Sequence, residues 1–273
     1  DIAQVAGIEL KSSSNLFVTH LRLNPTEDRI AFLLRYRLPD AGEETCLCTV
    51  GTDGSAPRVL ARGFVSHFDW IGQKDVMFWG RRNEAVATLR RHPLLANPIA
   101  RAILPLVKKP LRAILGRSAA MKMSYLNVPD VDGPSIVPFG LGVLEADGHP
   151  MYNPVQRGWL VTDTYPDADG ERDLMLYDIS ANRRIDLGRY RKIDTLPSPD
   201  VVTATAKHIE SHMGIDFPAA LYAFTRSGLH CDLHPRWSAD GRVIAFDSIH
   251  EGTRQIYSIE VAALMATSNL AMA

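Results

Sequence analysis

The chain has 273 residues, of which 46% are hydrophobic and 22% are charged, and its formal net charge is -1. A chain of this size and composition can bury a large core, and its near-neutral charge argues against a globally basic nucleic-acid binder. Three cysteines are too few for a disulfide-built scaffold, and no apolar run reaches the roughly 18 residues of a membrane span.

Four segments along the chain share one pattern: a histidine, a short strand, a polar turn and then an apolar strand of four or five residues. The segments begin at His20, His67, His149 and His234. Turn-forming pairs such as Asn-Pro and Asp-Gly separate the strands, because proline presets φ and glycine accepts a positive φ. Short strands punctuated by turns predict an all-β fold.

Further strands are predicted at 174–179 and 255–261, where aromatic and β-branched residues alternate. They complete units of about four strands, and repeats of ~40–45 residues with four strands are typical of β-propeller blades. We therefore predict an all-β β-propeller of about four blades, forming a single domain over residues 1–273. We expect this domain to be part of a larger propeller whose N-terminal blades it lacks.

The histidines are unevenly spaced, which predicts two partly helical insertions, at 82–122 and 192–227. The first is strongly basic and has helical composition interrupted by prolines. Its arginines could attract a negatively charged ligand, or it could be a solvated helix pair, or contact a membrane surface or a partner protein. The second insertion contains a predicted helix over Val201–Met213.

The recurrent histidines are candidate functional residues, because the first strand of each propeller blade lines the central channel. Imidazoles that converge on one channel could ligate a metal or take a proton. Asp232 lies two residues before His234, so an extended strand would place both on one face. A hydrogen-bonded core histidine is the alternative; we favour it for His20 and leave both interpretations open for His67, His149 and His234.

The repeats resemble TolB-like (WD40-like) β-propellers, and the chain more specifically resembles the oligogalacturonate lyases. These are seven-bladed propellers that cleave uronate oligomers by β-elimination. Three segments carry the resemblance: Ser66–Trp70 is similar to Thr-His-Glu-Phe-Trp, Gly148-His149 falls at a Ser-His motif, and Leu229–Pro235 matches Gln-x-x-His-x-His-Pro.

The resemblance implies a role for each matching residue. His67 would be the catalytic base, and His149, Asp232 and His234 would hold a divalent metal, for which Mn²⁺ is expected because a carboxylate ligand favours harder ions. Either Tyr152 or Tyr165 would protonate the leaving oxygen. The family's glutamine ligand is replaced by Leu229, and its arginine by a residue near Cys46.

Two functions follow from these observations. The first is a metal-dependent lyase that acts by β-elimination on a uronic-acid-containing oligosaccharide or polysaccharide. The alternative is a non-catalytic TolB-like propeller that binds a protein or glycan partner. We expect no nucleic-acid partner, and we expect a cytoplasmic location. A periplasmic or secreted location stays open because the chain opens at Asp1 without an initiating methionine.

Overall fold

The computed structural model describes residues 5, 7, 16–37, 43–81, 123–191, 199–213, 231–252 and 254–270. The chain divides into two compact units, Asp1–Asp147 and Gly148–Ala273, and each unit is described by itself. The basic insertion at 82–122 lies outside the described residues. In the second insertion the structure has a helix, α4 (Pro199–Met213), where the sequence predicted one.

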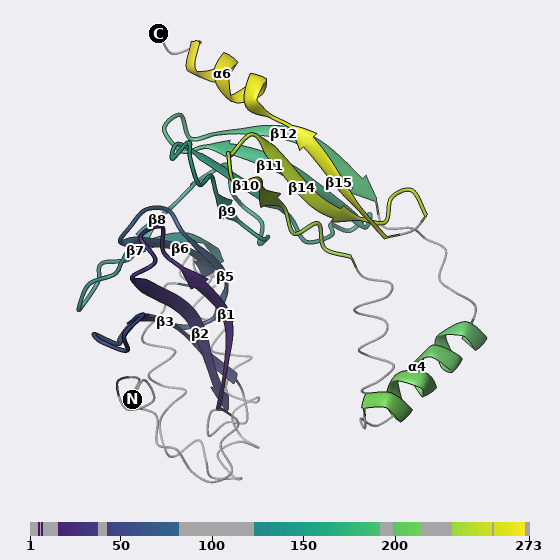
Figure 1. Cartoon of the computed structure of the whole chain (residues 1–273), viewed down its shortest axis with the longest axis horizontal. Coiled ribbons are helices and arrows are strands. Elements are labelled where there is room, and N and C mark those ends of the chain that lie inside the picture. Colours follow the sequence, from purple (N-terminus) through teal and green to yellow (C-terminus); the bar gives the residue numbers. More distant parts are fainter. Residues whose placement is uncertain are drawn as a thin grey trace, which may run out of the picture. The chain divides into compact units, whose positions relative to one another are not determined.

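The first unit contains two antiparallel four-stranded sheets, each a simple meander (Figure 1). The first sheet consists of β1 (Leu16–Leu23), β2 (Arg29–Arg37), β3 (Glu43–Gly51) and β4 (Arg58–Gly63). The second consists of β5 (Val65–Trp70), β6 (Asp75–Gly80), β7 (Ser124–Pro129) and β8 (Val137–Pro138). Strands that follow one another in the chain are therefore neighbours in each sheet.

The second unit contains a four-stranded and a three-stranded meander, with helices beside them in the sequence. The four-stranded sheet consists of β9 (Met151–Tyr152), β10 (Trp159–Asp163), β11 (Glu171–Asp178) and β12 (Arg183–Arg191). The three-stranded sheet consists of β13 (Arg236–Trp237), β14 (Val243–Ser248) and β15 (Gln255–Glu260), and it is followed by α6 (Ala262–Leu270).

Within each unit, the two sheets pack on one another through side chains that alternate along the strands. In the first unit, one core cluster joins Leu33 and Leu47 of the first sheet to Trp70 and Phe78 of the second. In the second unit, residues of β10 and β11 pack against Trp237 and the β14 strand. Burial of these apolar faces is the main force that holds neighbouring sheets together.

Four antiparallel meander sheets of this kind are the blades of a β-propeller, so the described residues confirm the predicted all-β fold class. The two thiols of Cys46 and Cys48 are both buried on one face of β3, as the two-residue period requires. Among the described helices, none has the length and apolar character needed to cross a lipid bilayer.

β-Bulges interrupt the first strands of both sheets in the first unit. The register of β1 with β2 shifts between Thr19 and Arg22, and that of β5 with β6 shifts between Val65 and Phe68. His20 and His67 therefore occupy equivalent bulged positions. A bulge redirects a side chain and recurs next to functional sites, but His20 is exposed, so our expectation that it belongs to the core is wrong.

Asn153 ties the first turn of one blade to the corresponding turn of the next blade in the second unit. Its side chain is fully buried; Nδ2 donates to the Gly241 carbonyl at 2.9 Å, and Oδ1 accepts from the amides of Val155 and Gln156. Gly241 has a φ of 68°, and a Cβ there would overlap Asn153 Oδ1. The predicted Asn-Pro and Asp-Gly turns are thus joined directly.

Replacing Asn153 with alanine should lower the free energy of unfolding by about 1–3 kcal/mol, because buried backbone groups lose their partners. Urea denaturation followed by tryptophan fluorescence measures this loss, since Trp159 and Trp237 are buried in the same unit. Ser258→Ala, at an exposed position of β15 with ordinary backbone conformation, is a control that should change stability less. Equal losses in the two variants would contradict the structural role of Asn153.

Candidate metal centre

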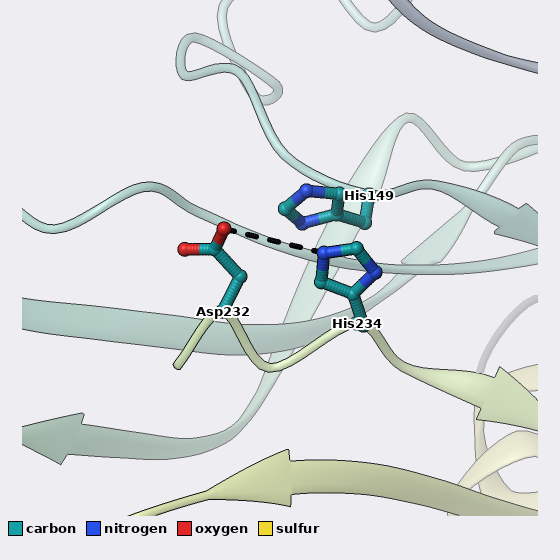
Figure 2. A group of neighbouring side chains, drawn as sticks. All are labelled: His149, Asp232 and His234. Carbon is teal, nitrogen blue, oxygen red and sulfur yellow. Dashed lines mark ion pairs between the residues drawn. The ribbon is translucent and has the colours of Figure 1, made fainter. Parts of the chain in front are cut away.

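Three side chains with metal-binding atoms converge in the second unit (Figure 2). His149 lies two residues before β9, whereas Asp232 and His234 lie in the segment before β13. One potential ligand atom from each residue lies within 4.8 Å of the others. The two imidazoles stack with ring centroids 3.7 Å apart, and His234 Nε2 lies 4.0 Å from Asp232 Oδ2.

A buried carboxylate at the end of β10 holds the two histidines. Asp163 is 1% exposed. Its Oδ1 accepts hydrogen bonds from the His149 backbone N–H at 2.6 Å and from His149 Nδ1 at 2.9 Å. Its Oδ2 accepts from the backbone N–H of His234 at 3.1 Å. Both histidine segments are therefore fixed to one side chain.

The backbone is sterically constrained at Gly148 and at His234, the two segments that lie against Asp163. A Cβ at position 148 would overlap the backbone carbonyl oxygen of Asp163, so only glycine allows the chain to approach this closely. His234 has a φ of 43°, in the left-handed region that few residues other than glycine adopt. Histidine, asparagine and aspartate are the non-glycine residues enriched there.

The protonation states in the cluster suit metal binding. Burial alone would raise the pKa of Asp163, but the hydrogen bond and charge of His149 and the two backbone N–H donors together hold it below its usual value. Burial, reinforced by the neighbouring His149, lowers the pKa of His234 to about 4. At neutral pH, His234 is therefore in the neutral form that a metal ligand requires.

Arg172 of β11 provides a positive charge next to Asp232. Its side chain is only 2% exposed, and Nε lies 3.6 Å from Asp232 Oδ1. The same carboxylate directs Oδ2 toward His234. Because the two oxygens face different neighbours, Asp232 can interact with Arg172 through one oxygen and offer the other to an ion.

The donor set fits a divalent metal. Two imidazole nitrogens and one carboxylate oxygen are three protein ligands, the number found in catalytic sites that keep an open position for water or substrate. Ligand atoms at ~2.1 Å from one ion lie roughly 3–3.5 Å apart. The cluster, with its separations of up to 4.8 Å, would therefore close by small side-chain rotations that separate the stacked rings.

The lowered pKa of His234 predicts a pH-dependent stability in the metal-free protein. Between pH ~6.5 and ~4, the unfolded chain binds a proton at His234 that the folded chain does not. The free energy of unfolding should therefore fall as the pH falls through this window. In His234→Asn, which keeps a residue tolerant of positive φ, this fall should be smaller.

Urea unfolding at pH 7.5 and 5, with a chelator present, measures the effect as the difference between the native protein and His234→Asn. The exposed His250→Asn variant controls for histidines outside the cluster. An identical pH dependence in the native protein and His234→Asn would contradict the prediction.

The two candidate tyrosines lie in different surroundings. The ring of Tyr165 lies 5.4 Å from that of His149. Tyr152 lies on β9 and pairs in register with Leu160, and burial raises the pKa of its hydroxyl while Arg157 opposes the shift. The contact with His149 makes Tyr165 the stronger candidate for a proton donor next to the cluster.

His67 lies in the first unit, where a carboxylate orients its ring. Its Nδ1 lies 3.0 Å from Asp147 Oδ1 and 2.9 Å from Ser66 Oγ, and the ring of His20 makes an edge contact at 5.8 Å. A hydrogen bond from Nδ1–H to Asp147 places the lone pair of the neutral ring on Nε2. This arrangement suits a general base, the role predicted for His67.

The structure thus brings together the three predicted metal ligands and places His67 beside Asp147. Leu229 and His230 lie outside the described residues. Sequence reasoning missed Asp163 and Arg172. Asp163 had a recognisable signal, because it ends a mostly apolar strand, and Arg172 had a weaker one, because it lies two residues before the core residue Leu174 and so shares its face of β11.

The fold and the cluster define a β-propeller with a candidate divalent-metal site. No protein-family model and no curated protein sequence matches the chain. Among solved structures, TolB from Acinetobacter baumannii is similar, with 13% identity and a TM-score of 0.47 over 88% of this chain and 40% of that one. This chain therefore spans less than half the length of that TolB.

Two other solved propellers are similar at the same level. An oligogalacturonate lyase in complex with manganese has 10% identity and a TM-score of 0.42, over 92% of this chain and 67% of that one. The β-propeller domain of the Trilobed protease from Pyrococcus furiosus has 11% identity and a TM-score of 0.44, over 90% and 54%. At these identities the likeness concerns the fold alone.

Proposed function

We propose that this protein is a metal-dependent lyase that cleaves a uronic-acid-containing oligosaccharide or polysaccharide by β-elimination. The observation that carries the proposal is the convergence of His149, Asp232 and His234, with ligand atoms within 4.8 Å, around a shared buried carboxylate. The motif resemblance of these residues and of His67 to the oligogalacturonate lyases supplies the reaction class.

The chemistry of β-elimination assigns a task to each group. The base must remove the proton on the carbon next to the uronate carboxylate, and the charge of that carboxylate opposes the removal. A divalent ion, with Mn²⁺ as the expected one, would supply positive charge to the carboxylate. His149, Asp232 and His234 would hold the ion.

Side chains of the protein carry out the two proton transfers of the reaction. His67 takes the proton at Nε2, while Asp147 fixes Nδ1 and stabilises the imidazolium that forms. Tyr165 donates a proton to the leaving oxygen; its contact with His149 favours it over Tyr152. The basic residues of 82–122 would attract the acidic chain.

One observation favours the alternative, a non-catalytic propeller that binds a protein or glycan partner. The family's arginine would fall near Cys46, and Cys46 is a fully buried thiol in an apolar cluster. A site without that arginine could retain the metal and the glycan yet not turn the substrate over.

A metal-binding and turnover experiment on the full chain separates the two functions. The protein is stripped with a chelator, titrated with Mn²⁺ and incubated with oligogalacturonate or with a neutral oligosaccharide of equal length. We expect a single bound ion, and metal-dependent growth of the ultraviolet absorbance of the unsaturated product with oligogalacturonate alone. Metal binding without this absorbance would contradict the lyase function and support a non-catalytic propeller that binds a partner. Failure to bind metal would contradict the site itself.

A further inference from the structure

We propose that Asp163 is the positioning residue of the metal centre: one carboxylate that sets the tautomer of His149 and fixes the backbone of His234. The inference rests on the proposed metal-binding function and deepens it. It concerns a residue that is not among the predicted ligands and that lies on a third segment of the unit, at the end of β10.

The hydrogen bonds of Asp163 are divided between the two histidines. Oδ1 accepts from the backbone N–H of His149 at 2.6 Å, and Oδ2 accepts from the backbone N–H of His234 at 3.1 Å. The ring nitrogen Nδ1 of His149 lies 2.9 Å from Oδ1 and 3.0 Å from Oδ2, so it can donate to either oxygen. The side chain is wholly buried. Both histidines are therefore tied to the blade that contains β10, although they lie 85 residues apart in the sequence.

The hydrogen bond to the ring has a direct chemical consequence. A carboxylate accepts a hydrogen bond and cannot donate one, so Nδ1 of His149 must carry the proton. The lone pair of the neutral imidazole is then on Nε2. Carboxylates that accept the second N–H of a ligating histidine orient the ring and raise its basicity.

The substitution Asp163→Asn tests this arrangement with little change in volume. The amide keeps one acceptor oxygen but replaces the other with an N–H donor, which would face either the His149 donors or the His234 amide. We expect the affinity for Mn²⁺, measured by isothermal titration calorimetry, to fall 10- to 100-fold, the range typical of lost outer partners of metal ligands.

Asp178→Asn is the matched control. Asp178 is also buried in this sheet, on β11, but it accepts from the amide and hydroxyl of Ser180 and from the amide of Ala181 at the following turn. The Asp178→Asn substitution should lower the free energy of unfolding and leave the affinity for Mn²⁺ within about twofold of the native value. An equal loss of affinity in both variants would show a general structural effect and overturn the proposal.

A second measurement needs neither metal nor activity, and it does not require the Asp163→Asn variant. Nitrogen-15 NMR of labelled histidines in the metal-free native protein reports the tautomer of each ring, and His149→Gln assigns the signal. We expect the Nδ1–H form for His149 at neutral pH. Finding the Nε2–H form would overturn the proposal. Because no ion is present, the Nδ1–H result would stand even if the native protein failed to bind metal, so the two failures are distinguishable.

Discussion

Replacing His149 with alanine is expected to lower the affinity of the protein for Mn²⁺ by at least about 100-fold. Loss of an outer partner of a ligand already costs 10- to 100-fold, and this substitution removes one of three ligands outright. It also leaves the buried Asp163 without its ring partner. Isothermal titration calorimetry and the electron paramagnetic resonance signal of free Mn²⁺ measure the loss.

The structure offers a control for this experiment in the same unit. His250 is an exposed histidine that hydrogen-bonds Ser248 and contacts Tyr257, so His250→Ala should bind Mn²⁺ as the native protein does. Circular dichroism checks the fold, and His149→Gln, which keeps a polar side chain, is the second variant should alanine fail to fold. Native affinity in both His149 variants would place the ion elsewhere.

Replacing His67 with alanine is expected to lower kcat for β-elimination by about 10²- to 10⁴-fold, the contribution typical of a positioned general base. The affinity for Mn²⁺ should not change, because His67 is not among the three side chains that form the candidate metal centre. Asp147→Asn should lower kcat less, since the ring keeps a hydrogen-bonding partner. Initial rates with oligogalacturonate at saturating Mn²⁺ measure both.

His20, which occupies the equivalent bulged position in the preceding sheet, provides the control for the His67→Ala experiment. His20 is exposed and touches the His67 ring only by its edge, so His20→Ala should retain turnover within about twofold. If His67→Ala also retained native turnover, another group would have to be the base. A loss of metal affinity in His67→Ala would contradict the separation of the two roles.

The sequence predicted the fold well because the local signals for strands and turns agree with the packing. The apolar run from Trp159 to Val161 is fully buried, and Asn-Pro and Asp-Gly mark turns that the structure joins through Asn153 and Gly241. The histidine pattern also located the segments that meet at the cluster, since equivalent positions of successive blades lie near each other.

The parts that the sequence did not predict depend on contacts between distant residues. Nothing within a few positions of Asp163 shows that it will accept hydrogen bonds from His149 and His234, or that Gly148 will be pressed against its carbonyl. Arg172 likewise has its partner 60 residues away. The exposure of His20 was missed because the bulge in β1 depends on the pairing with β2.

The left-handed backbone at His234 restricts what evolution or engineering can place there. Valine or isoleucine would clash with its own main chain at a φ of 43°, whereas aspartate fits both the conformation and the vacated ligand role. His234→Asp would create a centre with two carboxylates and one imidazole, which suits Mg²⁺ or Ca²⁺ better than softer ions. The single substitution His234→Asp is therefore sterically permitted and is expected to change which metal ion the centre prefers.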